Sequence, residues 1–363
     1  MRIGIDARAA SEEPGGRGRY VRELLRALAA RDDDHEYVLY ARTEWEPRGA
    51  LGPRFAWVLH GLPDPAWHLA TALRCGSCDV LLSTNSYLTA WAARAPTALT
   101  IFDLVAFDDA LSPRRRSRAI ERATLPLAVR RAAGFAAISA SARDDLEARF
   151  PRARGRVAVT PLAADPRFAP DPPGGAAIRA RHGLDGPYLL SVGTLEPRKN
   201  LPRLVAAFAA LPPATRGEHV LAVVGASGWD TAATEAALGA NAGAIRRLGH
   251  VPDEDLPALY AGATALCYPS LYEGFGLPVL EAMACGTAVL TSDRSSLPEV
   301  AGDAALLVDP RDEGAIAAGL ARLLTDGALR ERLAAAGPPR AAGFSWDRTA
   351  AGTLALLEGV ARG

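Results

Sequence analysis

The sequence at residues 188–200 reads Tyr188-Leu189-Leu190-Ser191-Val192-Gly193-Thr194-Leu195-Glu196-Pro197-Arg198-Lys199-Asn200. Its first five residues form an apolar run that predicts a buried strand. The apolar residues that follow at helical spacing predict a helix: Leu201, Leu204, Val205 and Phe208. A loop that leads from a strand into a helix points backbone N–H groups and the positive end of the helix dipole at whatever lies above the sheet. The segment therefore predicts one unit of an α/β fold with a candidate anion site in its loop.

Lys199 is the only lysine of the chain, because 41 Lys+Arg less this one leaves 40 arginines. Lysine is a compact point charge on a flexible stem, whereas arginine is a flat and bulky fork. A lysine kept where the chain otherwise uses arginine favours a crowded anion such as a phosphate. A solvated surface lysine is the alternative that this feature alone leaves open.

Short β-rich runs alternate with helical runs along almost the whole chain, which is typical of parallel sheets with crossover helices. In the first half, strands are predicted at Ile3–Ala7, Tyr37–Ala41, Phe55–Leu59, Val80–Ser83, Ala98–Phe102, Phe135–Ile138 and Val157–Thr160. In the second half, they are predicted at Tyr188–Val192, Val220–Gly225, Ile245–Leu248, Ala265–Tyr268, Ala288–Thr291 and Ala305–Val308. The fold class is therefore α/β, with two Rossmann-like, doubly wound parallel-sheet domains.

The proline-rich segment at residues 165–175 separates the two sets of strands and predicts an interdomain linker. We expect an N-terminal domain at 1–165, a linker at 166–178 and a C-terminal domain at 179–344. A final helix at 345–363, capped by Ser345, is expected to pack back on the N-terminal domain. Two such domains would face a central cleft at the carboxyl ends of their strands, where ligands bind in open α/β sheets.

Composition excludes several classes of protein. The formal net charge is zero, which gives no global field that would favour nucleic acid. No stretch approaches the roughly 20 apolar residues of a membrane span, and the N-terminus begins directly with a strand pattern, so we expect a cytoplasmic protein. Cys75 and Cys78 have metal or redox spacing, but a zinc site would need two further ligands. We therefore expect ordinary thiols and no metal.

The most specific motif lies at Tyr268-Pro269-Ser270-Leu271-Tyr272-Glu273-Gly274-Phe275-Gly276-Leu277-Pro278-Val279-Leu280-Glu281-Ala282-Met283-Ala284-Cys285-Gly286. A strand ends at Pro269, a glycine-containing loop follows, and Pro278 fits the first turn of a helix. Glycines let the backbone approach a ligand closely, and helix-start N–H groups can hold an anion. Glu273 and Glu281 could reach different parts of one ligand, although Glu281 could also be a helix surface residue.

Glu273 and Glu281 form an E-x7-E pattern that resembles the retaining nucleotide-sugar glycosyltransferases. Together with Gly193–Asn200, the motif is similar to glycosyltransferase family 4, whose fold is GT-B. The likeness extends through Leu248–Val251, Leu297–Gly302 and the glycine-rich Pro14–Tyr20. It spans nearly the whole chain and implies that the N-terminal domain takes the acceptor and the C-terminal domain the donor.

The donor-binding residues that the resemblance implies are Gly16, Arg198, Lys199, His250, Val251, Glu273, Gly274, Phe275, Gly276, Leu277 and Glu281. Arg198 and Lys199 would neutralise the donor diphosphate, while Glu273 would orient the transferred sugar without acting as a covalent nucleophile. Glu281 would bind the ribose hydroxyls. The resemblance places His250 and Val251 at the nucleobase and gives Gly16 an N–H contact with the diphosphate.

The acceptor-side candidates are Arg17, Asn85, Phe102 and Asp103. Phe102 stands where the family typically has a histidine, so a histidine-assisted step is in doubt and an altered sugar or acceptor pocket is expected. Asp103 is a catalytic candidate on the acceptor side, and a plain strand-end or turn carboxylate is its alternative.

The resemblance implies transfer of a hexose to an acceptor hydroxyl by a front-face, retaining mechanism that needs neither metal nor cofactor. GDP-mannose, UDP-glucose and UDP-N-acetylglucosamine are all compatible donors, and the acceptor could be a sugar, a glycan, a lipid-linked molecule or a natural product. A GT-B epimerase or phosphorylase, a Rossmann dinucleotide-binding oxidoreductase and a non-catalytic sugar-binding scaffold are the alternatives. The oxidoreductase rests on a weak glycine fingerprint near Gly16.

The basic stretch from Pro113 to Arg131 could be a membrane-surface helix, because it also carries apolar residues. A solvated basic face is favoured over peripheral membrane contact, since Pro126 is expected to interrupt the helix.

Overall fold

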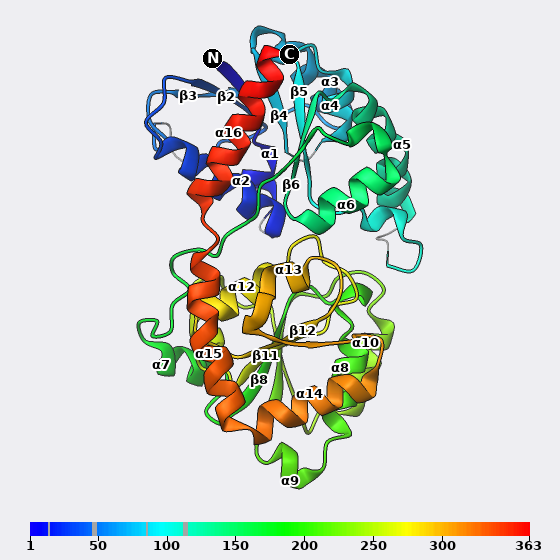
Figure 1. Ribbon diagram of the computed structural model, residues 1–363, viewed down its shortest axis with the longest axis vertical. Helices are drawn as coiled ribbons and strands as arrows, with labels where there is room; N and C mark the ends of the chain where they lie inside the picture. Colours follow the sequence, from blue (N-terminus) through cyan, green and yellow to red (C-terminus); the bar gives the residue numbers. More distant parts are fainter. Residues whose placement is uncertain (14, 46–48, 85, 112–114) are drawn as a thin grey trace. The chain divides into compact units, whose positions relative to one another are not determined.

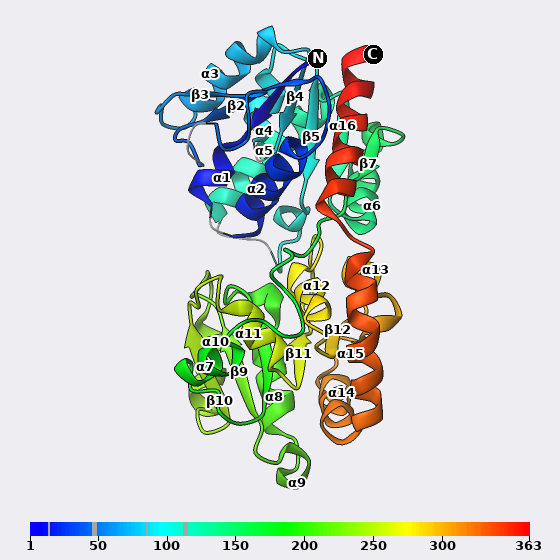
Figure 2. The same ribbon diagram turned by 90° about the vertical axis from the view of Figure 1, so that its left-hand side faces the viewer.

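The computed structural model describes residues 1–13, 15–45, 49–84, 86–111 and 115–363 (Figures 1 and 2). The chain divides into two compact units. Unit 1 comprises Met1–Leu162 and Ser345–Gly363, and unit 2 comprises Ala163–Phe344.

Unit 1 is built on a parallel sheet. Its strands are β1 (Arg2–Asp6), β2 (Glu36–Ala41), β3 (Phe55–Leu59), β4 (Val80–Ser83), β5 (Thr97–Ile101), β6 (Gly134–Ala137) and β7 (Val157–Val159). Its α-helices are α1 (Arg8–Glu12), α2 (Gly16–Ala29), α3 (Ala66–Arg74), α4 (Tyr87–Ala92), α5 (Arg115–Arg131), α6 (Ala140–Arg149) and α16 (Trp346–Arg362). Short 3₁₀ turns are η1 (Cys75–Ser77), η2 (Val105–Phe107) and η3 (Pro151–Ala153).

The strand order in unit 1 is β3-β2-β1-β4-β5-β6-β7. The order reverses between β1 and β4, which is the switch point where open α/β sheets bind ligands. The C-terminal helix α16 returns to unit 1, where it packs against α2 and several strands of the sheet (Figure 1). On the other face, residues of α4, α5 and α6 form a common apolar core with β5 and β6.

Unit 2 is a second parallel sheet with crossover helices. Its strands are β8 (Tyr188–Val192), β9 (Val220–Val224), β10 (Ile245–Gly249), β11 (Ala265–Tyr268), β12 (Val289–Ser292) and β13 (Leu306–Val308). Its α-helices are α7 (Gly175–Arg181), α8 (Leu201–Ala209), α9 (Pro213–Arg216), α10 (Ala232–Ala240), α11 (Leu256–Ala261), α12 (Leu277–Ala284), α13 (Leu297–Ala301), α14 (Glu313–Thr325) and α15 (Gly327–Ala342). Its 3₁₀ turns are η4 (Pro197–Lys199) and η5 (Gly302–Ala304).

The strand order in unit 2 is β10-β9-β8-β11-β12-β13, so the switch point lies between β8 and β11. The apolar face of α8 carries Leu204, Val205 and Phe208, which are fully buried in one core with residues of α10 and α14. The helix that the sequence predicts after residue 200 is confirmed, and its apolar spacing is what presents these side chains to the sheet.

The predicted strands all form, with ends that agree or differ by one residue, and the expectation of two Rossmann-like sheets is confirmed. One local expectation fails. Helix α5 continues through Pro126, because Leu125, Ala128 and Val129 around it are buried in the core of unit 1 and their packing offsets the missing N–H. Helix α7 begins at Gly175, within the expected 166–178 linker, and the bounds of the linker stay a prediction.

The cap of the final helix and the cysteines agree with the sequence analysis. Ser345 caps α16, since its hydroxyl accepts a hydrogen bond from the backbone N–H of Arg348. Cys75, Cys78, Cys267 and Cys285 are buried free thiols, in agreement with the reading as ordinary thiols. In the described part of the chain, no helix combines the length and the apolar character that crossing a membrane requires.

Asp6 lies at the end of β1 and should make the free energy of unfolding depend on pH. Its side chain is fully buried, and Oδ2 has no hydrogen-bond partner among the described residues. Burial raises the pKa of Asp6 to about 6, although Arg8 opposes the shift. Because the folded-state pKa lies above the unfolded one, the contribution of Asp6 to stability is present at low pH and is lost as the pH rises from about 4 to about 6.

We therefore expect Asp6→Asn to gain stability relative to wild type as the pH rises. The difference in free energy of unfolding should grow by about 3 kcal/mol between pH 4 and pH 8. Denaturant unfolding of both proteins at the two pH values measures it. A difference that does not change with pH would contradict a buried, proton-holding carboxyl at this position.

Candidate functional site

The candidate site of unit 2 lies where two loops leave neighbouring strands. Strands β8 and β11 pair in parallel, so the loop after β8, with Lys199, and the loop after β11, with Glu273, emerge at the same edge of the sheet. The structure brings these residues into contact although they are 74 positions apart: Nζ of Lys199 donates to Oε1 of Glu273 at 2.7 Å. Backbone holds the loops together as well, because the N–H of Leu271 donates to the carbonyl of Arg198 at 2.8 Å.

Glu273 is the centre of this cluster. Its side chain is buried, and both of its carboxylate oxygens have cationic partners: Lys199 on Oε1 and NH1 of Arg198, at 2.5 Å, on Oε2. The hydroxyl of Tyr268 also donates to Oε1 at 2.8 Å. Burial alone would raise the pKa of Glu273, but Arg198 and Lys199 outweigh it and lower the pKa to about 2. Glu273 is therefore an ionised carboxylate whose two oxygens are fixed in direction.

Lys199 has more polar partners than the sequence analysis predicted. Its ammonium also contacts the hydroxyl of Tyr268 and lies 4.7 Å from the centroid of that ring. Burial and the neighbouring Arg198 lower the pKa of Lys199, against the opposing effect of Glu273. Gly193 lies directly beneath the lysine stem, since a Cβ there would come within 3.2 Å of the Lys199 Cε. The space around the ammonium is thus narrow, as the choice of lysine over arginine suggests.

Sequence reasoning missed the residues that brace the two loops. Asn200 has a left-handed backbone (φ 60°), and its side-chain amide donates to the carbonyls of Pro269 (3.0 Å) and Pro310 (2.7 Å). The hydroxyl of Ser296 donates to the carbonyls of Glu273 and Phe275. An asparagine directly before a helix was the available signal for Asn200, because asparagine tolerates the left-handed region.

The loop after β11 enters α12 as the motif predicts. Gly276 has φ 108°, a backbone conformation that favours glycine, and a Cβ there would also lie 2.6 Å from the end of the Leu297 side chain. Phe275 is buried and packs edge-to-face on Phe344 at 5.7 Å, which makes its side chain part of the core. Glu281, one turn into α12, is buried and accepts a hydrogen bond from the hydroxyl of Tyr260 at 2.9 Å, which argues against a surface glutamate.

The remaining donor-side candidates of unit 2 lie after β10. His250 is exposed and Val251 is buried. The chain turns at Gly249 (φ 68°), whose carbonyl accepts from the N–H of Gly225 at 2.7 Å. Because β8, β9, β10 and β11 are parallel neighbours in the sheet, their loops share the edge that carries Lys199 and Glu273.

In unit 1, the structure brings together three of the acceptor-side candidates. The guanidinium of Arg17 lies 5.6 Å from the centroid of the Phe102 ring. Phe102 itself is buried and packs edge-to-face on Tyr20 at 5.2 Å. Asp103 is half-buried, and its Oδ1 accepts from the N–H of Val105 at 3.0 Å, as in a turn carboxylate. Asn85 lies outside the described residues.

Two further groups of this cluster were not expected from sequence. The hydroxyl of Tyr87 donates to Oε1 of Glu121 at 3.0 Å. Burial opposes the charge of Arg17, but nearby acidic groups outweigh it and raise the pKa of Arg17. These groups are Asp103, Tyr87, Glu121 and Glu13. Arg17 is therefore compensated by carboxylates of its own unit.

Gly16 and Gly18, near the start of α2, differ in whether local packing requires a glycine. A Cβ at Gly16 would meet no atom of the described residues within 4 Å, so local packing does not require glycine there. A Cβ at Gly18 would lie 1.7 Å from the carbonyl oxygen of Glu13, so α1 and α2 approach each other only because residue 18 is glycine. Sequence reasoning singled out Gly16, and the packing constraint falls on Gly18.

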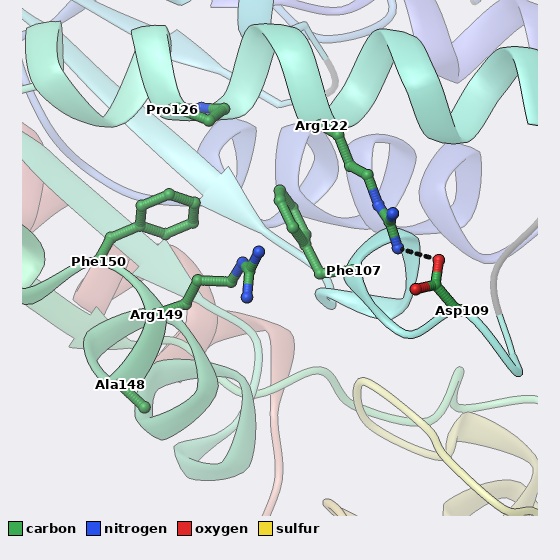
Figure 3. A pocket seen from close by; sticks show the side chains of 7 residues that line it. All are labelled: Phe107, Asp109, Arg122, Pro126, Ala148, Arg149 and Phe150. Carbon is green, nitrogen blue, oxygen red and sulfur yellow. Dashed lines mark hydrogen bonds and ion pairs between the residues drawn. The ribbon is translucent and has the colours of Figure 1, made fainter.

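The basic stretch of unit 1 borders a separate pocket of about 650 Å³ (Figure 3). Its lining residues are Phe107, Asp109, Arg122, Pro126, Ala148, Arg149 and Phe150. Arg122 is held by Asp109 at 2.8 Å and by the carbonyl of Ala106 at 2.6 Å, and Arg149 lies over the ring of Phe107. That the basic stretch is a solvated face, with peripheral membrane contact as its less favoured alternative, stays a prediction.

Comparison of the sequence with known proteins shows which family the chain belongs to. Residues 176–340 match the family described as "Glycosyl transferases group 1", and residues 14–168 match the one described as "Glycosyltransferase Family 4". The chain is 37% identical to the O-antigen chain mannosyltransferase B of Escherichia coli over 306 residues, which cover 83% of this chain and 76% of that protein. It is 28% identical to the MMP alpha-(1->4)-mannosyltransferase of Mycolicibacterium hassiacum, with 99% of this chain and 98% of that protein covered.

Solved structures agree on the fold. Sucrose-phosphate synthase from Thermosynechococcus elongatus superposes with a TM-score of 0.77 at 24% identity, with 99% of each chain covered. The conclusion rests on the two parallel sheets, on the loops that meet at the switch point of unit 2, and on these relatives. The chain belongs to the family 4 glycosyltransferases and is a glycosyltransferase of the GT-B fold.

Proposed function

We propose that this glycosyltransferase moves a hexose from a nucleotide diphosphate sugar to a hydroxyl of a glycan acceptor, and that the hexose is mannose. The transfer retains the anomeric configuration and needs no metal. Unit 2 would bind the donor and unit 1 the acceptor. The observation that carries the proposal is the cluster of Arg198, Lys199 and Glu273 at the switch point of unit 2.

The cluster suits departure of a diphosphate. When the bond between the anomeric carbon and the phosphate oxygen breaks, negative charge grows on the diphosphate and positive charge on the sugar. Lys199 and Arg198 are cations held in place before the reaction, so they stabilise the leaving group without a reorganisation cost. Helix α12 begins at Leu277, shortly after Glu273 in the chain, and would add the positive end of its dipole.

Glu273 fits an orienting role better than a nucleophilic one. Both of its oxygens already accept hydrogen bonds from cations, which fixes the carboxylate and lowers its nucleophilicity. In the step we propose, the acceptor oxygen bonds to the anomeric carbon on the face that the leaving group vacates. The acceptor proton passes to the departing phosphate oxygen, so neither a covalent intermediate nor a separate base is needed.

The choice of sugar and acceptor rests on two supports. Both relatives named above are mannosyltransferases, which supports mannose as the transferred sugar. In unit 1, Arg17, Phe102 and Asp103 lie together after β1 and β5, at the edge where parallel sheets bind ligands, which supports an acceptor pocket there. Phe102 gives that pocket an apolar wall in place of a histidine.

The test is a panel of donors with a mannoside acceptor in EDTA. GDP-mannose, UDP-glucose and UDP-N-acetylglucosamine are compared, and NMR gives the anomeric configuration of the product. We expect transfer from GDP-mannose with an α-linkage, and equal rates in EDTA and with Mg²⁺ added in excess of the EDTA. A β-linked product would overturn retention, a strict need for Mg²⁺ would overturn metal independence, and transfer from a UDP-sugar alone would overturn the mannose assignment.

Glu281 supplies a separate prediction for the nucleotide. If its carboxylate binds the ribose hydroxyls, Glu281→Ala should weaken the affinity for free GDP by about tenfold, in the range of a charge-assisted hydrogen bond. Tyr260→Phe is the matched control, because it removes only the hydroxyl that contacts Glu281 inside the unit. Calorimetric titration measures both. Unchanged GDP affinity in Glu281→Ala would count against the ribose role.

A further inference from the structure

Glu196 lies beside the candidate diphosphate site and has no role in the function proposed above. Its Oε1 forms an ion pair with NH2 of Arg198 at 2.6 Å, and its Oε2 accepts a hydrogen bond from the indole N–H of Trp229 at 3.1 Å. The side chain is only 13% exposed. A carboxylate with each oxygen on a different partner, and so little solvent, is fixed in direction.

The backbone places Trp229 for this contact. Glu196 and Trp229 follow the neighbouring strands β8 and β9, whose pairing continues beyond the strand ends through Leu195, which donates to the carbonyl of Ala226 at 3.0 Å. Gly228 in turn donates to the carbonyl of Leu195 at 3.0 Å. A Cβ at Gly228 would lie 2.5 Å from that carbonyl oxygen, so the two loops approach this closely only with glycine there.

The result is a row of alternating charges in which each member has a carboxylate or a cation beside it. Glu196 contacts Arg198, Arg198 contacts Glu273, and Glu273 contacts Lys199. The guanidinium of Arg198 is thereby held from two sides: NH2 by Glu196 and NH1 by Glu273. Without Glu196, NH2 of the guanidinium would lose this carboxylate partner, while NH1 would keep Glu273 and the carbonyl of Tyr272.

We propose that Glu196 is a positioning residue for sugar transfer: anchored by the indole of Trp229, it fixes the Arg198 guanidinium in the orientation that meets the donor diphosphate. The inference rests on the diphosphate role proposed for Arg198. It assigns to Glu196 and Trp229 an effect on turnover through Arg198, without contact with the substrate.

If Glu196 positions Arg198, its variants should lower kcat and leave GDP affinity intact. A residue that only braces the loops would instead affect folding and GDP affinity together. Glu196→Gln removes a negative charge beside a bound diphosphate, so free GDP should bind at least as tightly as to wild type. The released guanidinium should nevertheless lower kcat by about tenfold, since small displacements of a positioned group slow the reaction strongly. Trp229→Phe removes the indole N–H without changing charge, so GDP affinity should stay within about twofold while kcat falls severalfold.

The experiment measures kcat, the donor KM, GDP affinity and the melting temperature for both variants. Glu218→Gln and Trp91→Phe are the matched controls, because both side chains are more exposed and Trp91 belongs to α4 of unit 1. Normal kcat in Glu196→Gln would overturn the proposal. A joint loss of GDP affinity and melting temperature would also overturn it, since a brace alone would produce that pattern.

Lys199→Ala separates this inference from the proposed function. If Lys199→Ala loses transfer while Glu196→Gln keeps it, only the positioning role fails. If Lys199→Ala keeps both transfer and GDP affinity, the diphosphate assignment itself fails.

Discussion

Replacing Lys199 with alanine is expected to lower the turnover of sugar transfer by about a hundredfold to a thousandfold while the fold stays intact. The ammonium lies 2.7 Å from Glu273 on a side chain that is only 11% exposed, so its charge is poorly screened by water. Its attraction to the diphosphate grows as the glycosyl bond breaks, so kcat should suffer more than donor binding. Steady-state kinetics with the best donor of the panel measure the effect, and near-normal transfer would remove Lys199 from the site.

Lys199→Arg tests whether the site needs the shape of lysine as well as its charge. The lysine stem packs so close to Gly193 that even a Cβ there would crowd it, so the wider guanidinium should not reach the same position, and kcat should fall by at least about tenfold. Arg332→Lys is the matched control, because it exchanges the same two residue types at an exposed position of unit 2. Wild-type activity in Lys199→Arg would show that positive charge alone is sufficient.

Glu273→Gln is expected to reduce transfer by about a thousandfold and to leave the affinity for free GDP largely unchanged. The amide nitrogen of glutamine would face donors where the carboxylate now accepts from Lys199 and Arg198. The two cations would then lose the group that directs them but keep their attraction for the diphosphate. Because the pKa of Glu273 is lowered to about 2, the carboxylate is ionised at every pH of the assay, so lower pH should not mimic the variant.

Stability must be measured alongside Glu273→Gln, because removing one partner of a buried ion pair costs about 3–5 kcal/mol. Tyr268→Phe keeps the carboxylate and removes only one hydroxyl that donates to it. We expect this second variant to stay folded and to lose about tenfold in kcat. Full transfer activity in folded Glu273→Gln would contradict the orienting role.

The fold could be predicted from the sequence because its signal is local. Apolar runs such as Tyr188–Val192 are long enough for a strand and too short for a buried helix, and turn residues bound them. The error at Pro126 has the opposite cause. Proline opposes a helix locally, but Leu125 and Val129 bury their side chains in the core, and tertiary packing outweighs the lost hydrogen bond.

The site could be predicted only as a set of separate motifs. Lys199 and Glu273 each stood out, but their direct contact depends on β8 and β11 being neighbours, which no local pattern encodes. Glu196 and Trp229 went unassigned for the same reason: the partner of each lies on the loop of another strand. In unit 1, Tyr87 and Glu121 meet only because α4 packs on α5.

The central claim is that Lys199, Arg198 and Glu273 form the site for the donor diphosphate, and calorimetric binding of GDP and GMP tests it most directly. The two nucleotides differ only in the second phosphate, so the ratio of their affinities isolates what that phosphate contributes. We expect wild type to bind GDP at least about tenfold more tightly than GMP, and Lys199→Ala to lose most of this preference. Equal preference for GDP in wild type and Lys199→Ala would contradict the account.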